Sequence, residues 1–191
     1  MRVEHEFILG GQKSGKSRRA EQRAAEWLAE APAMRRAVLI ATAQAHDDEM
    51  QERIVRHQAD RARRVPAMRT VEEPVELARA IVTQSSPDTL VVVDCLTLWL
   101  TNLLMPLRSE AAQPVTRTPA SHAAMLLMAL REARGPVVLV GNEIGLGVIP
   151  LGRETRAFVD ALGRMNQDVA AACDRVTLMA AGLPLTLKAP A

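Results

Sequence analysis

Short apolar runs alternate with longer stretches of helical period along the chain. Five runs are predicted to be strands, at residues 5–9, 36–41, 89–94, 136–141 and 175–180. Several are continuously apolar and rich in β-branched residues, which is typical of strands covered on both faces. A final run, Leu-Pro-Leu-Thr-Leu-Lys at 183–188, alternates in polarity and predicts an edge strand, antiparallel to its neighbour.

Helices are predicted between these strands. Residues 15–30 place Ala20, Ala24 and Trp27 on one stripe, and residues 153–173 form another helix. Residues 47–62 open with Asp47, a good N-cap. Alternating strands and helices favour βαβ units and a parallel sheet. Residues 105–119 hold three prolines and predict a flexible loop or lid. The sheet pattern resumes after it, so we expect one domain over 1–191.

A phosphate-binding loop follows the first strand. Gly10, Gly15, Lys16 and Ser17 satisfy G-x-x-x-x-G-K-[ST] between a predicted strand and a predicted helix. Glycines let backbone N–H groups surround phosphates at the helix N-terminus. Lys16 is expected to reach the terminal phosphates and Ser17 to hold Mg²⁺.

An acidic residue is needed to complete the magnesium site of such a loop. Asp94 ends the apolar run Leu-Val-Val-Val-Asp and stands where this acid is usually found. A strand-ending Asp is also a common helix cap, here for the segment that begins at Cys95. Both interpretations remain open from the sequence.

His57 shares one face of its predicted helix with Met50 and Ile54. A histidine on an inward face is usually a packed core residue. Beside a bound triphosphate it is instead a candidate nucleophile, because neutral imidazole attacks phosphorus to form a phosphoramidate. Asp60, nearly one turn on, either orients the ring or lies exposed.

Composition narrows the function classes. The chain has 24 basic and 22 acidic residues, which gives no electrostatic case for nucleic acid. The cluster Arg61–Arg64 is either a solvated helix end or a phosphate contact. No apolar run is long enough to span a bilayer and no signal peptide is evident, so a cytoplasmic protein is expected. Cys95 and Cys173 are expected to be buried free thiols.

Several further segments occur in order and carry a family resemblance. They are IATAQAHDDEMQERIVRH, TVEEP, VVVDCLTLWLTNLL, VGNEIGLGVIP and GRMNQDVAAACDRVTLMAAGLPLTLK. With the P-loop they cover nearly the whole chain, which resembles the bifunctional adenosylcobinamide kinase / adenosylcobinamide-phosphate guanylyltransferase of cobalamin biosynthesis. The resemblance implies a three-layer α/β P-loop fold of the RecA-like group, a mainly parallel sheet and a homotrimer.

Two reactions are implied by this resemblance. ATP or GTP first phosphorylates the aminopropanol hydroxyl of adenosylcobinamide. GTP then guanylylates an enzyme histidine, and adenosylcobinamide phosphate takes up the GMP to give adenosylcobinamide-GDP. His57 matches that histidine. The implied nucleotide-binding residues are Gly10, Gly11, Gln12, Lys13, Ser14, Gly15, Lys16, Ser17, Thr42, Gln58, Ala59, Asp60, Arg61, Glu72 and Asp94.

Some positions depart from the family pattern. Arg56 precedes His57 where some members have two histidines, Gly141 replaces a Ser or Thr, and Gly152 and Val159 replace an Asn and an Arg. These changes put corrinoid contacts in that region in doubt. Asn142 and Glu143 end a strand and are assigned either to the substrate or metal surroundings or to loop capping.

Two rival functions remain. A simple P-loop kinase without a covalent intermediate would leave His57 merely packed. A nucleotide-dependent switch or nucleic-acid motor subunit would need a basic track or an interaction tail, and neither is clear in the sequence.

Overall fold

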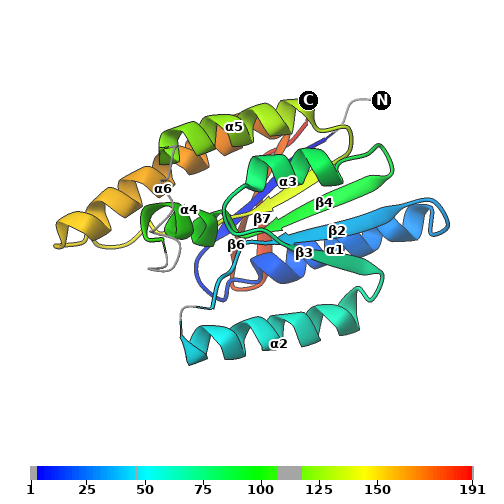
Figure 1. The fold of residues 1–191 in the computed structure, drawn as a ribbon, viewed down its shortest axis with the longest axis horizontal. Helices are drawn as coiled ribbons and strands as arrows, with labels where there is room; N and C mark the ends of the chain where they lie inside the picture. Colours follow the sequence, from blue (N-terminus) through cyan, green and yellow to red (C-terminus); the bar gives the residue numbers. More distant parts are fainter. Residues whose placement is uncertain (1–3, 46, 107–117, 191) are drawn as a thin grey trace.

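The computed structural model describes residues 4–45, 47–106 and 118–190. Within them the chain forms one seven-stranded sheet with helices on both faces (Figure 1). The strands are β1 Glu6–Gly10, β2 Arg36–Ala41, β3 Met68–Glu72, β4 Thr89–Asp94, β5 Val137–Val140, β6 Arg175–Ala180 and β7 Leu183–Lys188. The helices are α1 Lys16–Glu30, α2 Asp48–Arg64, α3 Leu77–Gln84, α4 Leu96–Leu104, α5 Pro119–Glu132 and α6 Arg153–Ala172.

The strands lie in the order β3-β2-β4-β5-β1-β6-β7. All neighbouring pairs are parallel except β6 and β7, which are antiparallel and carry a register shift at Val176/Thr177. The mainly parallel sheet and its antiparallel edge strand are therefore confirmed. β1, which leads into the P-loop, lies centrally between β5 and β6, so the carboxyl ends of β1, β4 and β5 meet at one edge of the sheet.

Two apolar layers hold the fold together, one on each face of the sheet. Phe7, Val91 and Leu139 face α3, α4, α5 and α6, where Trp99 and Leu126 are also buried. Ile8, Val92 and Val138 face α1, whose Ala20 and Ala24 pack against them. Successive residues of a strand point to opposite faces, so a continuous apolar run supplies both layers. Both cysteines are buried free thiols, as expected.

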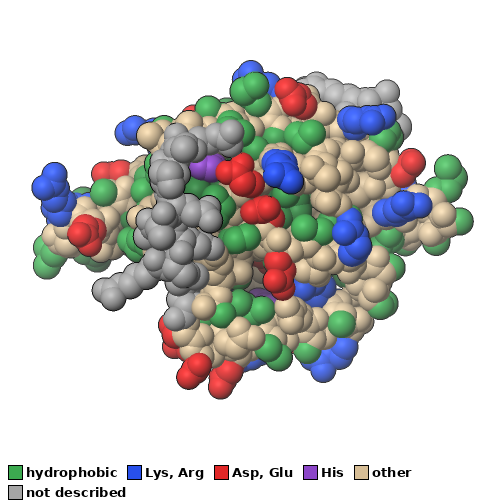
Figure 2. Space-filling view, viewed as in Figure 1, with side chains coloured by type: hydrophobic (Ala, Val, Ile, Leu, Met, Phe, Trp, Pro, Cys, Tyr) green, Lys and Arg blue, Asp and Glu red, His purple; other side chains and the backbone are tan. Residues whose placement is uncertain are grey.

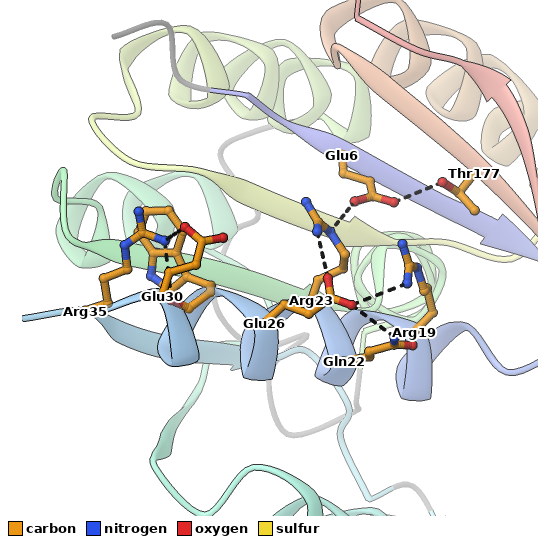
Figure 3. Close-up of polar contacts among 9 residues, drawn as sticks. Glu6, Arg19, Gln22, Arg23, Glu26, Glu30, Arg35 and Thr177 are labelled. Atoms are coloured by element: carbon orange, nitrogen blue, oxygen red, sulfur yellow. Dashed lines mark hydrogen bonds and ion pairs between the residues drawn. The ribbon is translucent and has the colours of Figure 1, made fainter. Parts of the chain in front are cut away.

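α1 is also held by charged contacts at its side facing β1 and β6 (Figure 3). The carboxylate of Glu6, almost fully buried, accepts hydrogen bonds from Arg23 Nε at 2.8 Å and from Thr177 Oγ1 at 2.9 Å. Arg23 also donates to Glu26 one turn further along α1. These contacts satisfy a carboxylate that would be costly to bury alone.

α2 differs from every other helix because none of its residues is buried. Its predicted N-cap is confirmed, with Asp47 Oδ1 accepting from Met50 N at 2.7 Å. At its other end Arg64 donates to the buried Glu21 of α1 at 2.8 Å, and Arg61 donates to Thr70 of β3 at 3.1 Å. α2 therefore lies outside α1, as Figure 1 shows, and polar contacts at its C-terminal end tie it to the rest of the molecule.

Some sequence expectations differ from the structure. β3, α3 and α5 were not assigned as separate elements, although each lies between predicted ones. The predicted loop over 105–119 falls mostly on residues 107–117, outside the described residues. No helix in the part of the chain that the structure describes is both long and apolar enough to cross a membrane.

Candidate active site

The P-loop takes the conformation that its glycines predict. Gly10 and Gly15 have φ values of 152° and 100°, in a region that L side chains rarely adopt. A Cβ on Gly10 would lie 2.5 Å from the Met179 carbonyl oxygen and 2.6 Å from Ser14 Oγ. The loop backbone thus packs too closely against β6 for any side chain at this position.

Lys16 begins α1 and is almost fully buried. Its Nζ donates to the Gly11 carbonyl oxygen at 2.6 Å, so the side chain lies over the loop. Burial lowers the pKa of Lys16; the negative charge of Asp94 raises it and the positive charge of Arg53 lowers it. Lys16 therefore lies within electrostatic reach of both the β4 carboxylate and an α2 guanidinium.

Asp94 ends β4 beside the P-loop. The first residue before α4 is Cys95, whose Sγ accepts from Leu98 N at 3.4 Å, so Cys95 and not Asp94 caps the helix. The capping interpretation of Asp94 is therefore wrong, and its carboxylate lines a cavity with Lys16 and Ser17. Burial raises the pKa of Cys95 to about 12, which makes this thiol a poor nucleophile.

A cavity of about 480 Å³ lies between the P-loop and α2. Residues 12–18 form one wall, the side of α2 that carries Arg53 and His57 forms another, and Asp94 and Asn142 lie at the ends of β4 and β5. An adjoining cavity of about 100 Å³ shares His57 and Asp94 with it. Figure 2 shows the surface hollowed between α2 and the rest of the molecule.

His57 faces this cleft and is solvent-exposed. The interpretation of His57 as a packed core residue is therefore wrong: the stripe with Met50 and Ile54 lines a cavity and not the core. Asp60 does not hydrogen-bond His57; it accepts from Arg63 at 2.6 Å and pairs with Arg64 at 3.5 Å. The hydrogen bond from Arg63 is the first cause of the lowered pKa of Asp60.

The remaining predicted site residues are distributed around the two cavities. Gln58, Arg61 and Glu72 line the smaller cavity, and Asp60 lines the larger one. Gly10, Gly11, Thr42 and Ala59 line neither. Thr42 is fully buried and exchanges two hydrogen bonds with the Cys95 backbone, through which it ties the end of β2 to the Asp94–Cys95 segment.

The segment after β5 lies against the P-loop. Glu143 N donates to the Gly10 carbonyl oxygen at 3.1 Å, and Asn142 N donates to Thr97 Oγ1 of α4 at 2.8 Å. Asn166 of α6 donates to the Asn142 carbonyl oxygen at 3.1 Å. Gly141 fits because a Cβ there would lie 2.9 Å from the Phe7 ring. These contacts hold the segment against the P-loop, where Asn142 lines the larger cavity, and Glu143 accepts a hydrogen bond from Gly145 N in a loop-capping contact.

Sequence reasoning did not identify Arg53, Leu98 or Asn102 as parts of the site. Asn102 of α4 donates to the carbonyl oxygens of Thr42 and Pro74, at 2.8 and 3.0 Å, and so positions the segments that follow β2 and β3. Arg53 stands four residues before His57, a spacing that places both on one helix face. The sequence could have indicated Arg53 through this spacing. No feature of the sequence indicates the tertiary contacts of Asn102.

The fold and the site define a P-loop nucleotide-handling enzyme. A structural neighbour, the flagellar accessory protein FlaH of Methanocaldococcus jannaschii, shares the fold at a TM-score of 0.52 and 9% identity, over 98% of this chain and 79% of that chain. The sequence model of one family, described as cobinamide kinase / cobinamide phosphate guanyltransferase (CobU), matches residues 6–187. The chain belongs to this family.

Relatives of the chain carry matching names. The bifunctional adenosylcobalamin biosynthesis protein CobP of Pseudomonas aeruginosa is 46% identical over 187 residues, 96% of each chain. The CobU proteins of Salmonella typhimurium and Escherichia coli are 36% and 33% identical, each over 95% of this chain and 98% of theirs. The resemblance stated from the sequence is therefore confirmed.

Proposed function

We propose that the protein phosphorylates the aminopropanol hydroxyl of adenosylcobinamide with ATP or GTP and then transfers GMP from GTP to the product through His57. The observation that carries this proposal is the position of His57, which lines the same cavity as Lys16 and Ser17 of the P-loop. A nucleophile and a triphosphate cradle on opposite walls of one cavity suit covalent guanylyl transfer.

The kinase step needs positioning and charge neutralisation at the γ-phosphate. Lys16 is the cation for this role, and its present partner, the Gly11 carbonyl, is a neutral group that a phosphate oxygen readily replaces. Backbone N–H groups of the loop bind the β-phosphate at the N-terminus of α1. The acceptor hydroxyl oxygen then bonds to the γ-phosphorus while the bond from that phosphorus to the β–γ bridging oxygen breaks. The nucleoside diphosphate takes the electron pair and departs within the same loop, and the hydroxyl proton is released to solvent.

Mg²⁺ is the divalent cation that we propose for this site. The Ser17 hydroxyl and the Asp94 carboxylate are hard oxygen donors that line the same cavity. The described residues contain no cluster of three His, Cys, Asp or Glu side chains, and Mg²⁺ at nucleotide sites typically takes few protein ligands together with phosphates and waters. The residues present therefore fit the ion, which Ser17 and Asp94 would hold and which would neutralise negative charge on the bound phosphates.

Guanylyl transfer uses the other end of the triphosphate. A ring nitrogen of His57 forms a bond to the α-phosphorus, and the bond from that phosphorus to the α–β bridging oxygen breaks. The electron pair leaves with pyrophosphate, which Lys16 and the loop stabilise. The phosphate oxygen of adenosylcobinamide phosphate then attacks the same phosphorus and frees His57. One cradle thus serves both steps.

The nucleoside is proposed to lie along α2. Gln58, Arg61 and Glu72 line the smaller cavity next to His57, where the base or ribose has polar partners. Thr42 positions Cys95, which lines the smaller cavity, through two hydrogen bonds to the Cys95 backbone. Asp60 lines the larger cavity. Asn142 is proposed to face the γ-phosphate and the acceptor.

A homotrimer is proposed from the family resemblance. Support comes from an apolar segment after β5, in which Leu146, Val148 and Leu151 are 82%, 97% and 96% exposed. Apolar residues exposed to this extent in one segment are typical of an interaction surface. A measurement of the molar mass in solution tests the trimer.

A cytoplasmic location, where ATP and GTP are available, also stays a prediction.

The experiment incubates the protein with Mg²⁺ and GTP labelled at the α-phosphate. We expect protein-bound label that is stable to alkali and lost in acid, as a phosphoramidate is. His57→Asn should carry none, whereas His122→Asn serves as the matched control because His122 is buried against Trp99, away from the cavities. A simple kinase would give no label, and full labelling of His57→Asn would place the nucleophile elsewhere.

A further inference from the structure

Arg53 lies one helical turn before His57 on the cleft-facing side of α2. Residues four apart on a helix lie on one face, with their side chains directed the same way. Both residues line the larger cavity with the P-loop, and both also line the smaller one. Arg53 therefore reaches the space in which His57 must meet a nucleotide.

Arg53 lines the larger cavity together with another cation, Lys16 of the P-loop. Among the causes that lower the pKa of Lys16, after burial, is the positive charge of Arg53. Two cations that face each other across a cavity repel, and an anion between them converts that repulsion into two attractions. A polyphosphate supplies such an anion, because it offers separate oxygens to each cation.

The other basic residues near the C-terminal end of α2 have protein partners. Arg63 binds Asp60, Arg64 binds Glu21 and Asp60, and Arg61 donates to Thr70. For Arg53, no ion pair with an acidic side chain occurs among the residues that the structure describes. The guanidinium of Arg53 is thus available to a ligand, whereas Arg64 holds α2 against α1 through Glu21 and Arg63 pairs with Asp60 of its own helix.

Guanylyl transfer requires a cation that the P-loop does not supply. When His57 attacks the α-phosphorus, Lys16 and the loop are engaged with the departing pyrophosphate. The non-bridging oxygens of the α-phosphate gain charge in the transition state and need a donor of their own. A guanidinium suits this role, because it stays charged and presents several N–H donors to phosphate oxygens.

We propose that Arg53 is a catalytic residue of guanylyl transfer, binding a non-bridging α-phosphate oxygen of GTP while His57 attacks the phosphorus. Atoms and charge balance as in the proposed function: the N–P bond forms, the bond to the bridging oxygen breaks, and pyrophosphate takes the electron pair. The proton on the other ring nitrogen of His57 is released to solvent. This inference rests on that proposed function and adds the residue that stabilises the reacting phosphate.

The test compares Arg53→Met with Arg63→Met, a substitution of the same type on the same helix at a position that lines neither cavity. Arg64 still holds Asp60 in the control. Single-turnover labelling at saturating GTP measures the rate constant for guanylylation of His57. We expect Arg53→Met to lower it about 100-fold and to lower the kinase rate much less, with Arg63→Met near wild type in both.

A phosphorothioate separates a catalytic contact from a structural role. GTP with sulfur on the α-phosphate exists as two diastereomers, and the wild type should guanylylate them at different rates. If Arg53 binds one of those oxygens, Arg53→Met should reduce the rate ratio between the diastereomers, whereas a merely misplaced helix should not.

Each outcome is informative. No label on the wild type would reject the proposed function itself. If the wild type is labelled and Arg53→Met is labelled at the same rate, the inference about Arg53 is overturned while the proposed function stands. Equal loss of both reactions would assign Arg53 to general triphosphate binding and overturn the α-phosphate assignment, as would an unchanged diastereomer ratio.

Discussion

Gly10 shows how closely a single residue controls the phosphate site. Its φ of 152° and its approach to the Met179 carbonyl leave no room for a side chain. Gly11, next to it, has nothing within 4 Å of the position that a Cβ would take. The two neighbouring glycines thus differ: the fold leaves no room for a Cβ at Gly10, whereas it leaves open space at Gly11.

We predict that Gly10→Ala destabilises the fold and Gly11→Ala does not. Backbone strain with a carbonyl clash costs about 2 kcal/mol, which lowers the melting temperature by roughly 4–8 °C for a chain of this size. Thermal unfolding of the two variants checks this. Equal melting temperatures would show that the loop relaxes around a new Cβ and that the close contact is not restrictive.

The motif residues were predictable because the pattern that identifies them lies within a short stretch of the sequence. The P-loop spacing identifies Gly10, Lys16 and Ser17 without any knowledge of the fold, and Asp94 follows from its place at the end of an apolar strand. Arg53 and Asn102 were not predictable in this way. The spacing of four residues places Arg53 on the face of His57, but only the fold shows that this face lines a cleft and that Asn102 contacts the segments after β2 and β3.

At the scale of elements, the strands covered on both faces were predicted and β3 was not. β4 and β5 are continuously apolar because α3, α5 and α1 cover their two faces. β3 is an edge strand whose residues are mostly half-buried or exposed, so the sequence Met-Arg-Thr-Val-Glu has no continuous apolar run. α2 was found from its period and its Asp47 cap, but periodicity does not reveal whether a stripe faces a core or a cleft.

His5 joins three elements at the opposite edge of the sheet. Its Nε2 donates to the Leu130 carbonyl of α5 at 2.9 Å, and its Nδ1 accepts from Val137 N of β5 at 3.2 Å. Its own backbone N donates to Asp174, between α6 and β6. This arrangement needs a neutral ring with its proton on Nε2. Burial accordingly lowers the pKa of His5.

We predict a stability loss in mild acid that depends on His5. The folded pKa lies below the unfolded value of about 6.5, so the folded state binds fewer protons and its stability falls as pH drops below that value. Melting temperatures from pH 7.5 to 5.5 should decline in the wild type and stay flatter in His5→Gln. His57→Gln, at an exposed position, should follow the wild type; a wild-type slope in His5→Gln would contradict the account.

At the scale of the whole molecule, the P-loop and His57 of α2 lie on opposite walls of one cleft. The P-loop is firmly held, because it follows the central strand β1 and because the backbone N–H groups of Glu143 and Gly182 donate to carbonyl oxygens of the loop. α2 carries His57 without burying a residue, so few apolar contacts fix its position. A firmly held P-loop and a loosely held His57 suit the proposed function, in which the triphosphate is used first at its γ-phosphate and then at its α-phosphate.

The distribution of charge agrees with small-molecule chemistry. Basic and acidic side chains are interspersed over the face seen in Figure 2, and that face carries no continuous basic track. A nucleic-acid motor would need such a track to follow phosphates. The membership of the family of cobinamide kinases / cobinamide phosphate guanyltransferases accords with this picture.

We propose that one P-loop serves two reactions and that His57 takes part in only one of them. The most direct test measures both activities of His57→Asn on the same preparation: phosphorylation of adenosylcobinamide, and formation of adenosylcobinamide-GDP from adenosylcobinamide phosphate and GTP. We predict kinase activity within a few-fold of wild type and no detectable guanylyl transfer. Retention of guanylyl transfer, or loss of both activities in a variant that folds normally, would contradict the account.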